Sequence, residues 1–589
     1  MPDQTYPQAV AKTHGAYTAH QEHSPTLISL AGDNRKVWVE RNGAIRFAIT
    51  DDFLLWTGKV PDYPCELKPK FGSGNEAGLE RKLYEGWLPV PVVTVKENGV
   101  VYQERVFVAP YDNEYLAKGA PWLSKHALGG AEFTIENTTS EPADVSLELR
   151  FLADWNEKVP ASLEKNALSL VAHKLGRLLI SVDATESPML DGEVKENTFI
   201  LKGELPPRTS ARCYAYIPTW DMRPDESPLL TGGENLLDDV EAYWRRLLAP
   251  AMQIDIPDPE LENLIRASQV YCMICARHED EGSRFAMWYG GILYGALEGD
   301  SHYGIIGLDS MGHHDFAQRC LDFFVNRYNP EGFLTMGYTL MGTGWHLWIL
   351  SQHYELTNDR LWLEKISPEV TRVCRWIMEQ REKTKKLDTH GNKVAEYGLM
   401  PPGVEADWNA FAYYFCFNGY FYAGLDGVGR ALLDLEHPEA EAFVKSAEEH
   451  RQEILRAFHH AQAQAPVQPL RDGTWAPLYP SQVHCPAPTN DFFPGEDFNR
   501  TWCYDVEEGA HHLVAQGVLD PNSQDVTWMV DHMEDVHFLA DGWFYYKAEE
   551  SEKDPFNLGG FSKVQPYLTR LSQIYALRDD VKPFIRSYY

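Results

Sequence analysis

Carboxylates gather in the second half of the chain, in loops that also carry aromatic residues and turn formers. Two loops could supply a catalytic pair: PPGVEADWN, which contains Glu405 and Asp407, and TNDFFPGEDFNRTW, which contains Glu496 and Asp497. A glycosidic bond is cleaved when one carboxylic acid protonates the leaving oxygen and a carboxylate about 5–10 Å away activates water or attacks the sugar. These residue types therefore fit acid and base chemistry on sugars.

The first loop presents its acids on a constrained backbone. The segment Pro-Pro-Gly that ends at Gly403 keeps a helix from forming ahead of Glu405 and Asp407. Trp408 follows, and an aromatic neighbour stacks on sugar faces and lowers the local polarity, which raises a carboxyl pKa and keeps the group protonated. We expect Asp407 or Glu405 to be the general acid. The alternative is that Asp407 caps a helix that opens at Trp408.

The second loop is similar in kind. A Pro-Gly turn precedes Glu496 and Asp497, the candidate catalytic partners of the first loop. Arg500 and Trp502 follow about one turn later, and Arg500 could bind a carboxylate or hold an acid ionised. We expect both to contact the substrate. The alternative is an ordinary surface turn with a local arginine pair.

Two further segments are expected to bind the substrate. Glu298 and Asp300 precede a helix in LEGDSHYGIIG, where Asp300 would cap the helix and Glu298 would face a pocket. Trp345 and His346 follow the flexible MGTG and suit sugar stacking and hydroxyl binding. For His346 the alternative is a satisfied structural histidine.

The elements that position these residues change type along the chain. Alternating and β-branched runs joined by Asn-Gly or Asn-Thr-Thr turns fill residues 25 to about 220 and predict an antiparallel sandwich. From Asp258 onward the apolar period is helical. The predicted helices cover 258–280, 300–312, 313–328, 343–356, 359–382, 417–436, 439–464, 505–518, 522–538, 562–578 and 580 onward. Buried and charged helices alternate, which indicates an inner ring wrapped by an outer ring.

Four segments carry a family resemblance: VEAYWRRLLAPAMQIDIPDPELENLIRAS, LEGDSHYGIIGLDSMGHHDFAQRCLDFF, GTGWHLWILSQHYELTNDRLWLEKI and GLMPPGVEADW. With them the chain resembles the six-hairpin glycosidase superfamily. The resemblance implies an α+β multidomain fold, with a β-sandwich (1–225), a helical linker (226–257) and an (α/α)6 catalytic barrel (258–589). It also implies twelve barrel helices, whereas the predicted ones end with an eleventh. We therefore expect an apolar seam that a homo-oligomer, a partner or a further C-terminal segment would cover.

Composition excludes several classes of function. The chain of 589 residues has 86 acidic and 53 basic residues, a formal charge of −33, so nucleic acid and anionic membrane surfaces are not expected partners. Nine scattered cysteines, with Cys272 and Cys275 inside a helical pattern, indicate reduced, mostly buried thiols. The sequence has no phosphate loop, dinucleotide fingerprint or metal-binding spacing, so no cofactor or metal is expected. No signal or membrane segment is evident, which favours a cytoplasmic protein, or a secreted or periplasmic one whose signal was removed.

Three hypotheses follow. The first is a glycoside hydrolase acting on an oligosaccharide or plant-type glycan. The second is a polysaccharide lyase on a uronic-acid-containing glycan, with groups drawn from His346, Asn409, Tyr413 and Arg500. The third is a carbohydrate-binding protein without catalytic activity.

Overall fold

The structure, a computed structural model, describes residues 25–47, 65–76, 78–112, 114–116, 119–153, 162–166, 168–288, 295–336, 341–405, 408–470, 472–484, 511–532 and 570–586. These residues form two compact units. The β-rich unit holds the described residues up to 296 together with 307–320, and the helical unit holds 297–306 together with those from 321 onward. The domain boundaries at residues 225 and 257 stay predictions.

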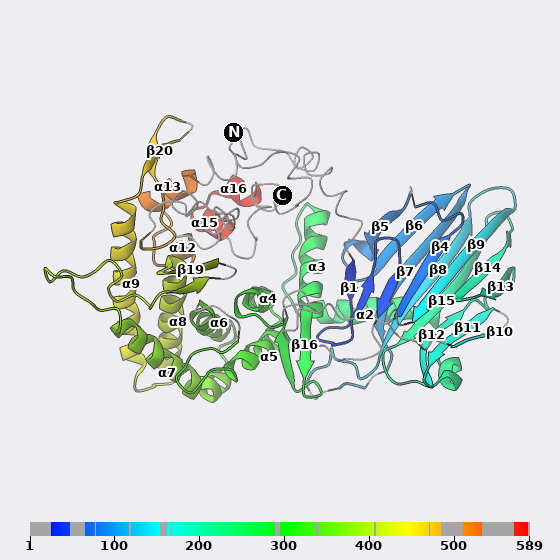
Figure 1. Cartoon of the computed structure of the whole chain (residues 1–589), viewed down its shortest axis with the longest axis horizontal. Helices are drawn as coiled ribbons and strands as arrows, with labels where there is room; N and C mark the ends of the chain where they lie inside the picture. The colour runs from blue at the N-terminus through cyan, green and yellow to red at the C-terminus, as the bar shows by residue number, and fades with distance from the viewer. Residues whose placement is uncertain are drawn as a thin grey trace. The chain divides into compact units, whose positions relative to one another are not determined.

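The β-rich unit contains two large antiparallel sheets (Figure 1). The first has the order β1 (Thr26–Ile28), β2 (Val37–Val39), β3 (Ile45–Phe47), β4 (Cys65–Phe71), β9 (Ala143–Ala153), β14 (Thr198–Leu205) and β13 (Leu190–Lys195). The second has the order β10 (Ser162–Asn166), β11 (Ser169–Lys174), β12 (Arg177–Asp183), β15 (Ser210–Pro218), β8 (Ala127–Asn137), β7 (Val100–Pro110), β6 (Pro91–Glu97) and β5 (Glu80–Leu83).

The two sheets pack face to face. The ring of Phe71 on β4 lies 6.0 Å from that of Tyr102 on β7 and 6.5 Å from that of Phe133 on β8. Along β4, exposed Lys68 and Lys70 alternate with buried neighbours, as the period of a strand with one solvent face requires. The predicted antiparallel sandwich is confirmed.

The Asn-Gly pair between β6 and β7 forms the predicted hairpin turn. Glu97 pairs with Val100, and both Asn98 (φ 50°) and Gly99 (φ 80°) have positive φ. Two consecutive positive φ values define the primed turn whose twist matches that of the flanking strands.

Two helices follow the sandwich within the same unit, α2 (Gly233–Leu248) and α3 (Pro259–Cys275). Asp258 caps α3 by accepting hydrogen bonds from the N–H groups of Glu260 (3.0 Å) and Leu261 (3.1 Å), and Pro259 occupies the first helical position. The predicted start at 258 is therefore confirmed. The predicted end at 280 is wrong, because the chain turns after Cys275 into a hairpin of β16 (Ala276–Glu279) and β17 (Arg284–Met287).

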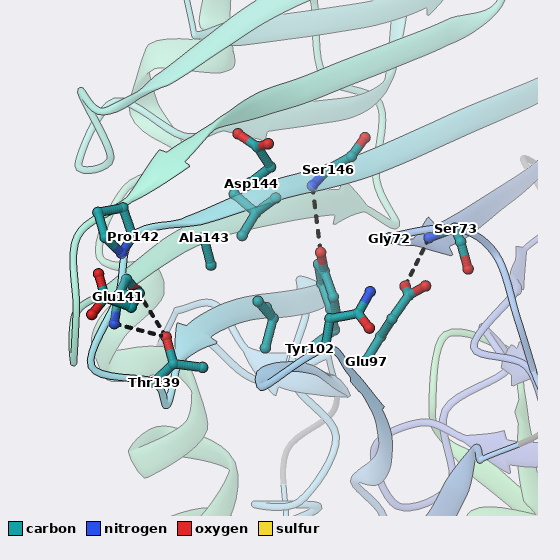
Figure 2. Close-up of a pocket in the computed structure, with 13 residues that line it drawn as sticks. Gly72, Ser73, Glu97, Tyr102, Thr139, Glu141, Pro142, Ala143, Asp144 and Ser146 are labelled. Atoms are coloured by element: carbon teal, nitrogen blue, oxygen red, sulfur yellow. Dashed lines mark hydrogen bonds between the residues drawn. The ribbon is translucent and has the colours of Figure 1, made fainter.

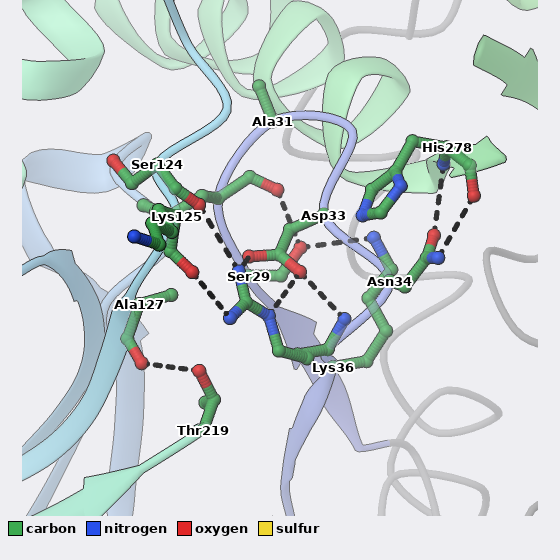
Figure 3. A network of polar contacts seen from close by, with 12 residues as sticks. Ser29, Ala31, Asp33, Asn34, Lys36, Ser124, Lys125, Ala127, Thr219 and His278 are labelled. Carbon is green, nitrogen blue, oxygen red and sulfur yellow. Dashed lines mark hydrogen bonds and ion pairs between the residues drawn. The ribbon is translucent and has the colours of Figure 1, made fainter. Parts of the chain in front are cut away.

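A buried polar network joins the β1–β2 connection to this hairpin (Figure 3). Lys36 donates hydrogen bonds to Ser29 Oγ (3.1 Å) and to the carbonyl oxygens of Ile274 and Ala276 at the end of α3. Asn34 donates to the carbonyl of His278 and accepts from its N–H, each at 2.9 Å. The network satisfies carbonyls that a helix end leaves without partners.

Most of the described chain after α3 is helical; the unit boundaries at residues 306 and 320 fall within the first two helices, and the later helices lie in the helical unit (Figure 1). The helices after α3 are α4 (Glu298–Ser310), α5 (His314–Val325), α6 (Met341–Thr357), α7 (Arg360–Glu382), α8 (Phe415–Asp434), α9 (Ala440–Gln462), α12 (His511–Ala515), α13 (Gln524–His532), α15 (Leu571–Leu577) and α16 (Val581–Arg586). Most of these match the predicted ranges within a few residues. None of the described helices combines the length and apolar character of a membrane-spanning segment.

Glycines bring α6 and α8 into close contact. A Cβ placed on Gly344 of α6 would lie 2.8 Å from the backbone N of Phe421, and one on Gly424 would lie 2.7 Å from the carbonyl oxygen of Gly344. Helix α9, with its charged outer face, packs on the other side of α8, where Gly429 lies against Val444. Buried helices and charged helices therefore alternate as predicted. An antiparallel sandwich followed by such helices is the architecture that the resemblance to the six-hairpin glycosidases implies.

Three predicted helices, 505–518, 522–538 and 562–578, are only partly covered by the described residues. The predicted number of helices and the predicted apolar seam therefore stay predictions. The helical half also contains two small hairpins that were not predicted. They are β18 (Gly403–Glu405) with β19 (Trp408–Ala412) and β20 (Val467–Pro469) with β21 (Trp475–Pro477).

Candidate active site

Four aromatic residues meet near the N-terminal ends of α4, α6 and α8, and we call them the aromatic cluster: Tyr303, Trp345, Trp348 and Tyr420. The rings of Trp345 and Tyr420 are stacked, with centroids 4.3 Å apart and an interplanar angle of 9°. Tyr303 meets Trp345 edge-on at 4.5 Å, and Trp348 lies 5.6 Å from Tyr420. Trp345 and Tyr420 are fully buried, whereas Tyr303 and Trp348 keep partial exposure. The two partly exposed rings suit contact with a sugar face.

Arg570, immediately before α15, joins the aromatic cluster. Its guanidinium lies over the Tyr303 ring at 4.7 Å and over the Trp348 ring at 5.7 Å, and it donates a hydrogen bond of 3.1 Å to the Tyr420 hydroxyl. Burial raises the pKa of the Tyr420 phenol, although the charge of Arg570 opposes this rise. Tyr420 therefore stays neutral at physiological pH and accepts from Arg570.

Buried histidines surround the cluster. The Tyr420 hydroxyl lies 3.2 Å from His512 Nδ1. The ring of His346 stacks on that of His302 at 5.1 Å, and its Nδ1 lies 2.5 Å from the Tyr328 hydroxyl. Burial lowers the pKa of His346 to about 3, so its ring is neutral. His346 and Trp345 are both 0% exposed, and their predicted contacts with substrate stay predictions.

Glu298 begins α4 and is 2% exposed. A Cβ on Gly342, in the first turn of α6, would lie 2.0 Å from Glu298 Cγ, so only a glycine lets the two helix ends approach so closely. This approach fixes Glu298 at the same end of the helices as the aromatic cluster. Asp300 lies in the first turn of α4, and its side chain is outside the described residues.

The first acid loop forms the hairpin β18–β19 ahead of α8. Glu405 pairs with Trp408 across the hairpin, and Asp407 is outside the described residues. The alternative that Asp407 caps a helix at Trp408 is wrong, because Trp408 begins strand β19 and α8 begins only at Phe415. The side chains of Glu405, Trp408 and Asn409 are not among those described.

The second acid loop, with Glu496, Asp497, Arg500 and Trp502, lies wholly outside the described residues. Of the lyase candidates, Tyr413 is partly buried, its ring meets that of His484 edge-on at 5.8 Å, and burial raises its phenol pKa. A raised pKa keeps the phenol protonated at neutral pH, so the deprotonated form that could remove a proton is less populated.

Sequence reasoning missed five residues of this candidate site: Tyr303, Trp348, Tyr420, His512 and Arg570. Three of them had a usable signal, since an aromatic residue stands near the start of each predicted inner helix 300–312, 343–356 and 417–436. Arg570 had no such signal in the sequence, because the surrounding segment QPYLTRLSQ contains no other charged residue.

The β-rich unit has a cavity of its own, of about 650 Å³, between turns at one end of the sandwich (Figure 2). Glu97 accepts a hydrogen bond from the Ser73 N–H (2.9 Å), and the Tyr102 hydroxyl accepts one from the Ser146 N–H (3.4 Å). Tyr102 is 3% exposed, so its ring offers no face to a sugar. The predicted site residues all lie in other parts of the chain.

The solved structures to which the chain is similar include these two. One is a bacterial glucoamylase complexed with acarbose, with 9% identity over 88% of this chain and 79% of that chain, at a TM-score of 0.48. The other is a putative kojibiose phosphorylase from the human microbiome, with 9% identity over 75% of this chain and 67% of that chain, at a TM-score of 0.39. No family model and no curated protein matches the sequence.

Proposed function

We propose that this protein is a glycoside hydrolase that cleaves an oligosaccharide or plant-type glycan at the N-terminal ends of α4, α6 and α8. The observation that carries the proposal is the convergence, at this one end, of the aromatic cluster with Glu298 and with the hairpin that bears Glu405. Rings that keep partial exposure stack on sugar faces, and carboxylates beside them supply acid and base.

In the proposed mechanism one acid loop supplies the general acid, and the other supplies the base or nucleophile. Asp407 or Glu405 donates a proton to the leaving oxygen, and Glu496 or Asp497 activates water or attacks the sugar carbon. A separation of about 5 Å between the two carboxyl groups would give retention of configuration, and a wider one would give inversion. Glu298 is proposed to accept hydrogen bonds from substrate hydroxyls.

A polysaccharide lyase is the second candidate, because the described site holds more tyrosine hydroxyls than carboxylates. Tyr303 and Tyr420 stand beside Arg570, whereas Glu298 is the acid described there. In a lyase a tyrosine removes the proton beside a uronic acid, and an arginine neutralises its carboxylate.

The full chain incubated with a panel of neutral and acidic plant oligosaccharides separates these functions. A hydrolase produces new reducing ends without ultraviolet absorbance, whereas a lyase produces an unsaturated sugar that absorbs in the ultraviolet. Calorimetric binding with no product after long incubation would contradict both and favour a binding protein.

A further inference from the structure

Arg570 differs from most of the other described arginines of the helical unit in what surrounds it. Arg375, Arg430 and Arg456 each form an ion pair with an acidic side chain. Arg381 is buried and donates to backbone carbonyls and a serine hydroxyl. Arg570, by contrast, has a tyrosine hydroxyl as its acceptor and lies over the rings of Tyr303 and Trp348. In the part of the chain that the structure describes, no carboxylate forms an ion pair with Arg570.

The guanidinium also has a donor that no described acceptor satisfies. Its Nε is buried and has no hydrogen-bond partner among the described residues, while one Nη donates to Tyr420. A buried charged donor without an acceptor is unfavourable, because it has lost its hydrogen bonds to water without replacing them. In a chain with a formal charge of −33, acids that could neutralise Arg570 are abundant, yet none of the described ones does so. This arrangement suits a guanidinium whose acceptor arrives with a ligand.

The aromatic cluster holds the guanidinium and adds a surface for a sugar ring. Tyr303 and Trp348 lie against Arg570, and both keep partial exposure. The N-terminal ends of α4, α6 and α8 lie at the same end, and each carries the partial positive charge of a helix start. An anion that reaches Arg570 is therefore favoured by the local field as well as by the guanidinium.

We propose that Arg570 binds the carboxylate of an acidic sugar, so that the substrate of this site is a uronic-acid-containing glycan. This rests on the proposed function, because it places the sugar in the same site. A carboxylate accepts two parallel N–H bonds from one guanidinium, and Nε with an Nη forms such a fork. The sugar ring that carries the carboxylate lies against Trp348, whose ring face is the neighbouring partly exposed surface.

The test measures binding of glucuronate, galacturonate, glucose, galactose and inorganic phosphate to the full chain by calorimetry. We expect the two acidic sugars to bind and their neutral counterparts to bind at least about tenfold more weakly, as loss of one charged hydrogen-bonding pair predicts. Arg570→Gln should reduce binding of the acidic sugars to the level of the neutral ones. Arg327→Gln is the matched control, because Arg327 also lies over an aromatic ring, that of Phe323 at 3.3 Å, in the same unit. It should leave binding unchanged.

Three results would overturn the proposal: equal affinity for acidic and neutral sugars, unchanged affinity in Arg570→Gln, or Arg570-dependent binding of phosphate without binding of acidic sugars. If Arg570→Gln does not fold, Arg570→Lys decides, since lysine keeps the charge but not the fork. Weaker binding of acidic sugars in that variant supports the proposal, and unchanged binding contradicts it. Cleavage of neutral glycans without this binding would support the proposed hydrolase function and contradict the proposed uronate substrate. Arg570-dependent binding of acidic sugars without any cleavage would support uronate binding and contradict the hydrolase function.

Discussion

The indole of Trp345 lies parallel to the phenol of Tyr420, 4.3 Å from centroid to centroid, and so joins α6 to α8 beneath the partly exposed rings of the aromatic cluster. Both residues are 0% exposed. Trp345 is therefore part of the packing between the two helices, and Trp348, one turn further along α6, is the indole that stays partly exposed.

Trp345→Ala should lower the free energy of unfolding by about 3–5 kcal/mol, because it leaves a large cavity between two helices. Trp348→Ala is the matched variant on the same helix. We expect it to weaken sugar binding by about 1 kcal/mol while the protein stays folded. Urea denaturation and calorimetry with the tightest-binding sugar measure the two effects. If the Trp345→Ala protein keeps its stability but binds sugar weakly, Trp345 contacts the substrate and is not a packing residue.

Gly344→Ala should destabilise the protein by about 1–3 kcal/mol, because overpacking a tight contact forces the helices apart. The added methyl group would lie 2.8 Å from the backbone N of Phe421, where no side chain can give way. Gly307→Ala is the control, since Gly307 also lies in a helix and a Cβ there would meet nothing within 4 Å. It should stabilise the helix by up to about 1 kcal/mol. Equal melting temperatures for the two variants would contradict the close approach of α6 and α8.

Glu104 makes the stability of the sandwich depend on pH. Its side chain is 0% exposed, neither carboxyl oxygen has a hydrogen-bond partner among the described residues, and burial raises its pKa well above the usual range. The folded state then holds a proton that the unfolded state releases above about pH 4.3. The contribution of Glu104 is therefore favourable below that pH and is lost as the pH rises towards the raised folded pKa, by at most about 1.4 kcal/mol per pH unit.

Glu104→Gln should remove this loss, so the variant should gain stability over the wild type at about pH 8 and gain little at about pH 4. Glu136→Gln, on the neighbouring strand β8, is the control, because Glu136 is exposed. Urea denaturation at both pH values measures the difference. A gain that is the same at both pH values would show that Glu104 is not protonated in the folded protein.

Local signals in the sequence were enough for much of the fold. The Asn98-Gly99 pair forms the turn that its residue types require, and Asp258 with Pro259 starts α3. Helix α8 differs by two residues at each end from the predicted 417–436. In each case the deciding interactions lie within one turn or one helix face, so a single sequence window contains them.

The site depends on contacts that no window contains. Arg570 meets Tyr303 and Tyr420, which are 267 and 150 residues away in sequence, and the role proposed for it follows only from that meeting. The hairpin at Glu405 and Trp408 was missed because the apolar periodicity there is too short to indicate a strand. Burial of Trp345 was missed for a related reason, since an inner helix is apolar on most faces, whereas for His346 the structural alternative was already open.

Asp407→Asn should lower turnover by at least about a hundredfold with little change in melting temperature, because general acid catalysis contributes about 10²–10⁴ to rate. No helix begins at Trp408, so Asp407 does not cap one there, and the substitution should not destabilise a helix.

Asp388→Asn is the matched control. Asp388 is exposed, lies in the same unit and accepts hydrogen bonds from the N–H groups of His390 and Asn392, which asparagine can still accept. Its activity should equal that of the wild type. Turnover close to the wild-type value in Asp407→Asn would remove Asp407 from the proton-transfer role, and the same measurement on Glu405→Gln would then decide whether this hairpin supplies the general acid at all.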